Sequence, residues 1–171
     1  MKKLTVRDIA EFAMLGALMF AGKKFIEFLP NVHPLTLLTV VYTVVYRRRA
    51  IYPLAVYLLL ETAFSGFVWI VPYYYIFPLC YFVSLLVPRG ASRVKRQVLY
   101  TLICTFFGIA FGALYAPWQA VMYGLNLERT LLWISAGLPY DIVHAVANCI
   151  LSFLIIPIAN GIEKIKSSAR R

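Results

Sequence analysis

Charged residues are scarce in this chain. Only 14% of its 171 residues are Asp, Glu, Lys or Arg, against about 25% in soluble domains. Hydrophobic residues make up 62%, and the mean hydropathy is +0.78. A soluble domain of this size could not bury so much apolar surface, which excludes a soluble enzyme domain, a disordered chain and a secreted disulfide scaffold. The composition predicts an integral membrane protein with room for about six helices of about 20 residues.

Motifs for catalysis and for metal binding are also missing. The sequence has no G-x-x-x-x-G-K-[ST] phosphate loop, no H-E-x-x-H and no G-x-S-x-G. Its three cysteines, Cys80, Cys104 and Cys149, lie singly in apolar runs and are typical of small buried hydrophobic residues. We therefore expect no catalytic residue, metal or cofactor in this chain, and any ATP-driven step would need a partner ATPase.

Six apolar segments are separated by prolines and by charged turns. Because they are continuous rather than alternating, they favour helices over a membrane β-barrel. The second segment has only twelve residues, or about 18 Å of helix, so it cannot cross the roughly 30 Å core alone and needs shelter from protein. Residues 130–137 are expected to form a short separate piece at the interface. The sequence predicts an all-α membrane protein, one domain over 1–171, with helices at about 9–28, 35–46, 51–69, 73–87, 97–116 and 139–162.

Positive charge is concentrated on one side of this arrangement. Fourteen of the 17 Lys and Arg residues lie before the first segment, after the last, or in the loops near Arg48 and Lys95. The positive-inside rule then places both termini in the cytoplasm. This asymmetry explains the net charge of +10 without nucleic acid, and such a basic rim favours anionic lipid headgroups.

Aromatic and polar residues are concentrated on the opposite side. They are Asn31, His33, Trp69, Tyr73, Tyr74, Tyr75, Tyr115, Trp118, Gln119, Tyr123, Asn126, Glu128, Trp133 and Tyr140. Each aromatic alone fits the belt found at any bilayer interface. As a mixed group on one side they favour an outward-facing pocket for a ring-bearing ligand.

Ionisable residues within the apolar segments are costly and rarely face lipid. Asp141, His144 and Asn148 share one helix face, which is either a satisfied hydrogen-bond network, a ligand contact, or a site of proton relay or catalysis. Lys23 and Glu27 are four residues apart and either pair on one helix face or snorkel to water at the outer end of the helix. Glu61 either pairs inside the protein or lines a water-filled cavity.

The first segment carries a run of small residues. Ala13, Ala17 and Ala21 recur every four positions, a spacing that lets a second helix approach closely. Spacing alone leaves two interpretations open: packing within this protein's own bundle, or docking of a partner membrane protein.

These features together resemble a known family. The length, the six helices with both ends inside, and the stretch from Ala13 to Ala21 are similar to the substrate-binding S components of energy-coupling factor transporters. Residues 30–34, 45–49 and 138–144 resemble a Firmicute subgroup associated with cobalamin. The resemblance implies a non-enzymatic bacterial plasma-membrane protein that captures a vitamin from outside. It also implies docking, through Ala13, Ala17 and Ala21, onto a transmembrane coupling protein that carries two ATPase subunits.

Pocket residues vary within this family, so we select candidates from topology and chemistry. The candidate substrate-binding residues are His33, Tyr73, Tyr74, Trp118, Gln119, Tyr140, Asp141, His144 and Asn148. Two alternatives are an intramembrane enzyme that uses Asp141 and His144 on lipid-like substrates, and a scaffold whose alanine face only assembles a complex.

Overall fold

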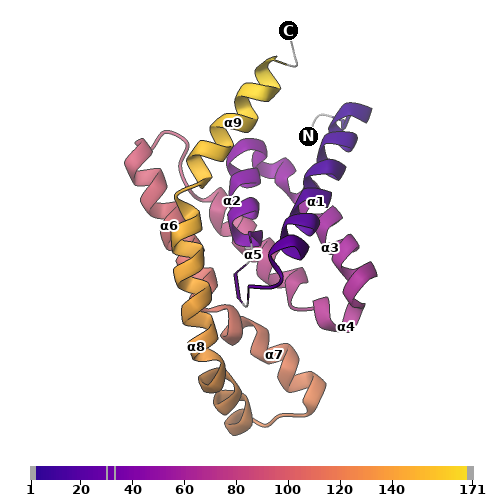
Figure 1. Cartoon of the computed structure of the whole chain (residues 1–171), viewed down its shortest axis with the longest axis vertical. Coiled ribbons are helices and arrows are strands. Elements are labelled where there is room, and N and C mark those ends of the chain that lie inside the picture. Colours follow the sequence, from indigo (N-terminus) through magenta and orange to yellow (C-terminus); the bar gives the residue numbers. More distant parts are fainter. Residues whose placement is uncertain (1–2, 30, 33, 169–171) are drawn as a thin grey trace.

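The computed structural model describes residues 3–29, 31–32 and 34–168, and this part of the chain is helical without strands (Figure 1). The all-α class predicted from the sequence is therefore confirmed. The elements are α1 Val6–Ile26, α2 Leu35–Tyr46, the 3-10 turn η1 Arg47–Ala50, α3 Ile51–Ser65, α4 Phe67–Ile70, α5 Tyr73–Leu85, α6 Arg93–Ile109, α7 Phe111–Tyr123, α8 Leu127–Ser152 and α9 Ile155–Ser168.

Three of the described stretches are long and apolar enough to cross a membrane. They are Phe67–Leu85, which joins α4 and α5, Arg93–Tyr123, which joins α6 and α7, and Leu127–Ser152, which is α8. Less than half of each stretch is buried inside the protein. Large apolar side chains therefore remain on the outer surface, as expected for helices whose solvent is lipid.

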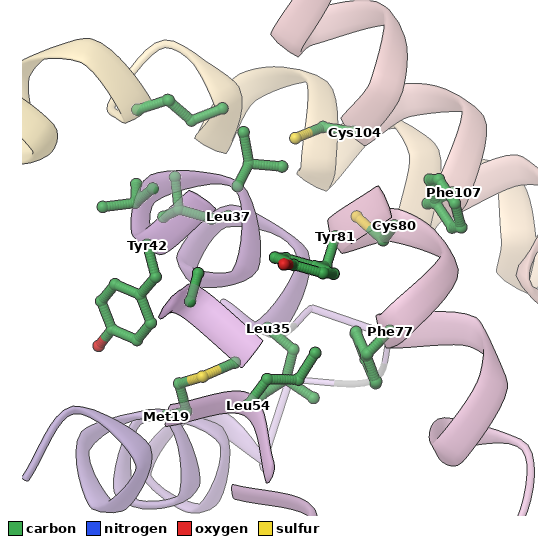
Figure 2. Close-up of a cluster of buried hydrophobic side chains, with 14 of the residues drawn as sticks. Met19, Leu35, Leu37, Tyr42, Leu54, Phe77, Cys80, Tyr81, Cys104 and Phe107 are labelled. Carbon is green, nitrogen blue, oxygen red and sulfur yellow. The ribbon is translucent and has the colours of Figure 1, made fainter. Parts of the chain in front are cut away.

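The short helix α2 lies in the centre of the bundle (Figure 1). It packs against α5, α9 and η1, with further contacts to α1, α6 and α8. Nine of its twelve residues are buried. Figure 2 shows its Leu35, Leu37 and Tyr42 among core side chains from α1, α3, α5 and α6. The surrounding helices thus supply the shelter that this twelve-residue segment needs, and its bounds are those predicted.

Local capping and glycine set several helix ends differently from the prediction. The first helix begins at Val6, not near residue 9, because Thr5 and Asp8 form a reciprocal capping box. The predicted helix over 51–69 is wrong at its C-terminus. Gly66 adopts a φ of +84°, which ends α3 at Ser65 and starts the separate short helix α4.

Prolines interrupt the later helices less than predicted. The segment predicted over 97–116 begins at Arg93, breaks at Ala110 and continues through Pro117 to Tyr123. The helix predicted over 139–162 is also wrong: α8 starts at Leu127 and includes Pro139, and a turn at residues 153–154 separates it from α9. Residues 130–137 are accordingly part of α8 rather than a separate piece. A proline removes one N–H, but neighbouring groups can satisfy the freed carbonyl in an apolar bundle.

Candidate functional site

An aromatic and polar cluster connects α1, α3, α5, α7 and α8. The ring of Tyr73 packs edge-on against Phe111, with centroids 6.1 Å apart, and the Lys23 Nζ lies 5.3 Å from the Tyr73 ring centroid. Phe111 in turn packs edge-on against the imidazole of His144 at 5.1 Å. We call Lys23, Glu61, Tyr73, Phe111 and His144 the central cluster. It brings together two residues selected from the sequence, Tyr73 and His144, through a phenylalanine that was not selected.

A buried ion pair forms the α1–α3 side of this cluster. Lys23 Nζ lies 2.6 Å from Glu61 Oε1, and the Glu61 side chain is fully buried. Ser65 also donates to Glu61 Oε1 at 2.7 Å. The predicted pairing of Lys23 with Glu27 is wrong, because Glu27 instead binds Lys24 at 3.1 Å. Of the two interpretations given to Glu61, internal pairing is the one observed.

Two polar atoms on the same face of α3 retain unused hydrogen-bonding capacity. Glu61 Oε2 and Tyr57 Oη are buried, and neither has a hydrogen-bond partner within residues 3–29, 31–32 and 34–168. Tyr57 precedes Glu61 by one helical turn. A buried polar group without a partner is costly. A polar group of a bound molecule would lower that cost if it donated to Glu61 Oε2 or formed a hydrogen bond with the Tyr57 hydroxyl.

Asp141 serves as an anchor for the start of α7. Both of its carboxylate oxygens accept from the backbone N–H of Gly112, at 3.0 and 3.2 Å. Gly112 is the second residue of α7, where the first backbone N–H groups of a helix have no partner within the helix. A Cβ at Gly112 would collide with the Asp141 carboxylate. The missing side chain therefore allows α8 to cap α7 directly.

We expect Asp141→Ala to lower the free energy of unfolding by about 1.5–3 kcal/mol, because it removes a buried charged acceptor from a backbone donor. Thermal unfolding in detergent measures the loss. Glu128→Ala, which removes an exposed acid from the first turn of the same helix, is the control and should change stability by less than about 0.5 kcal/mol. Equal stability of the two variants would contradict the anchoring role.

Asn148 connects three helices from the same face of α8. Its amide Nδ2 donates to the Cys104 carbonyl of α6 at 3.2 Å and to Thr36 Oγ1 of α2 at 3.4 Å. Asp141, His144 and Asn148 are all at least nine-tenths buried. The shared polar face predicted from their spacing is therefore the face that α8 turns into the bundle.

Side chains of α5 and α7 link α7 to its neighbours. The Trp118 indole N–H donates to the Val68 carbonyl at 2.8 Å, and the Tyr115 hydroxyl donates to the Trp69 carbonyl at 2.8 Å. The N–H that would serve the Val68 carbonyl in a continued helix belongs to position 72, which is a proline. Tyr75 donates from α5 to the Leu114 carbonyl at 2.7 Å. We call these three contacts the aromatic latch.

The remaining predicted site residues are not joined to the central cluster by any of these contacts. The Tyr74 hydroxyl lies 2.8 Å from Thr62 Oγ1. Gln119 is half-buried on α7, and Tyr140 is 61% exposed on α8. His33 lies outside the residues that the structure describes. The described part of the chain holds no group of three His, Cys, Asp or Glu residues suited to a metal ion.

No protein-family model, curated protein or solved structure shows significant similarity to this chain. The site is therefore interpreted from its own residues. Sequence reasoning missed Lys23, Glu61 and Phe111 as parts of it. A signal existed for the first two, because a lysine and a glutamate within apolar helices must find partners, here across 38 residues of sequence.

Proposed function

We propose that this chain is the substrate-capturing S component of an energy-coupling factor importer in the bacterial plasma membrane. Its single membrane domain crosses the bilayer six times, with both termini in the cytoplasm. The three apolar stretches of α4–α5, α6–α7 and α8 supply three crossings. The other three crossings are α1, which at 21 residues is about 32 Å long, α2 inside the bundle, and α3. The arginine-rich turn η1 between α2 and α3 then lies on the cytoplasmic side, and α9 continues the α8 crossing toward the C-terminus.

The observation that carries this proposal is the uncovered alanine face of α1. Ala13, Ala17 and Ala21 are all exposed. Helix α1 instead packs on α3 through Gly16, where a Cβ would lie 2.6 Å from Val56 Cβ and 2.7 Å from the Pro53 carbonyl oxygen. Packing within the bundle therefore does not use the alanines. A small-residue face left open on a membrane helix is suited to close approach of another helix, here the transmembrane coupling protein.

The substrate is a ring-bearing vitamin, with cobalamin as the first candidate, and it binds toward the outer face. Tyr73 and His144 of the central cluster are aromatic side chains of the kind that stack on a ring-bearing ligand, and both pack against Phe111. Trp118 and Tyr115 of the aromatic latch lie where α7 meets α4. His33, Tyr74, Gln119, Tyr140, Asp141 and Asn148 complete the proposed set of substrate-binding residues.

This chain captures substrate, and two partner ATPase subunits hydrolyse ATP. Both carboxylate oxygens of Asp141 already accept from the Gly112 N–H, which weighs against a free catalytic carboxylate and so against the alternative of an intramembrane enzyme. The other alternative, a scaffold that only assembles a complex, differs from the proposal in binding no vitamin.

A binding titration tests the proposal. The purified protein in nanodiscs, without ATP or partners, should bind one member of a vitamin panel that includes cobalamin, saturably and at one site. Tyr73→Ala should raise the Kd at least about tenfold, because a central aromatic contact is lost. Phe153→Ala, which removes an exposed aromatic ring at the C-terminal end of α8, outside this group, is the control and should leave the Kd unchanged. Folded protein that binds no vitamin in the panel would contradict the proposal.

A further inference from the structure

A charged cavity lies far from the central cluster, between the N-terminal end of α1, η1 and the C-terminal half of α9. Its volume is about 570 Å³, within the range of roughly 300–1,000 Å³ typical of ligand pockets. Figure 1 shows these ends of α1 and α9 at the same end of the molecule. The charged side chains that line the cavity are Lys3, Arg7, Asp8, Glu11, Arg49 and Lys166.

The lining carries four positive and two negative side chains, a net charge of +2. The two acids hold the inner wall in place. Asp8 Oδ2 lies 3.3 Å from Arg49 Nη1, and Glu11 Oε1 lies 3.7 Å from Lys166 Nζ. Glu11 also accepts from the Tyr46 hydroxyl at 2.6 Å. The excess of positive charge favours binding of an anionic group that carries one or two negative charges.

One wall of the cavity is apolar and continues out of it. Ala10 and Met14 line the cavity, and Met14 is 67% exposed. One turn further along α1, Leu18 is 55% exposed. The cavity therefore opens onto a strip of apolar surface on a helix that the proposed topology places in the membrane. A soluble anion would leave this strip unused, whereas a molecule with a charged head and a hydrocarbon chain would cover both surfaces.

We propose that this cavity binds the headgroup of an anionic phospholipid, with an acyl chain lying along Met14 and Leu18. The phosphate sits among the positively charged side chains, where hydrogen bonds to charged donors are strongest. A basic pocket between membrane helices is suited to such headgroups. The lipid would adjoin the alanine face of α1 without occupying the central cluster, so this inference does not depend on vitamin binding.

Native mass spectrometry of the protein released from nanodiscs tests the proposal. Nanodiscs of mixed phosphatidylglycerol and phosphatidylcholine should yield protein that retains one phosphatidylglycerol in preference to phosphatidylcholine. The double substitution Lys3→Gln with Arg7→Gln should weaken that retention about 30-fold, the effect of two charges at about 1 kcal/mol each. Both residues are exposed at the rim, so the variant should fold normally.

The double substitution Arg89→Gln with Lys95→Gln is the matched control. It removes the same charge from exposed positions outside the cavity and should leave retention unchanged. Equal retention of the two lipids, or equal loss in both double variants, would overturn the proposal. Glycerol phosphate added in solution should compete only weakly. Competition as strong as that of the lipid would instead identify a soluble-anion site and would also overturn it.

Discussion

Ala17→Trp is expected to abolish vitamin uptake and leave vitamin binding unchanged. The indole would project from the centre of the exposed alanine face and hold the proposed coupling protein away from α1. Nothing in the interior would move, since the packing face of α1 consists of Phe12, Gly16 and Met19. Uptake in cells that express the whole transporter, together with co-purification of the coupling protein, measures the first effect. The Kd of the isolated chain measures the second.

Ala136→Trp provides the matched control for this experiment. It places the same side chain at an exposed position on α8, well away from the alanine face in the sequence. Uptake should persist in this variant. If Ala17→Trp left complex formation and uptake intact, docking through α1 would be wrong. Loss of vitamin binding in Ala17→Trp would show instead that the substitution disturbs the fold.

Glu61→Leu is expected to lower the free energy of unfolding by about 3–5 kcal/mol, since it leaves the Lys23 ammonium in a buried position without its carboxylate. Only 12% of the Lys23 side chain is exposed, so solvent cannot replace the lost partner. The loss can be measured by unfolding the protein in detergent with increasing dodecyl sulfate. Ser65 also loses its acceptor, which adds to the effect.

Two further variants distinguish loss of the Lys23–Glu61 ion pair from the general effect of removing a glutamate side chain. Combining Lys23→Met with Glu61→Leu should recover most of the lost stability, because a buried pair is often replaceable by apolar residues of similar volume. Glu27→Leu breaks the neighbouring pair with Lys24, whose glutamate is 56% exposed, and should cost less than about 1 kcal/mol. If the double variant were as unstable as Glu61→Leu alone, the coupling between Lys23 and Glu61 would be disproved.

Continuous apolar patterning was sufficient to predict the all-α class and the exact bounds of α2. It was less informative about the other helix ends. The sequence predicts that Pro117 ends one helix and that Pro139 begins another, yet both lie within helices, because a proline's effect depends on whether nearby donors can reach the freed carbonyl. The break at Gly66 comes from a backbone conformation that composition alone does not specify.

In the candidate site, too, relations within one helix could be predicted from the sequence, whereas contacts between helices could not. Helical spacing correctly placed Asp141, His144 and Asn148 on one face, since that relation lies within one element. The partners of these residues, such as Gly112 for Asp141, depend on how separate helices pack. Lys23 likewise binds Glu61 on α3 rather than its near neighbour Glu27. The Glu61 carboxylate is fully buried and therefore needs a positively charged partner, whereas water solvates the exposed Glu27 carboxylate.

The aromatic latch determines what the intrinsic fluorescence of this protein reports. The chain has three tryptophans: Trp69 on α4, Trp118 on α7 and Trp133 on α8. The first two meet at the latch, and Trp133 stacks on Tyr115 of the latch at 6.4 Å. Emission excited where only tryptophan absorbs therefore originates from the α4–α7–α8 region, and α1 and α2, which hold no tryptophan, contribute none to it. Unlabelled protein thus carries its own local optical probe where α7 meets α4, while Ala17→Trp would add a chromophore on the otherwise silent face.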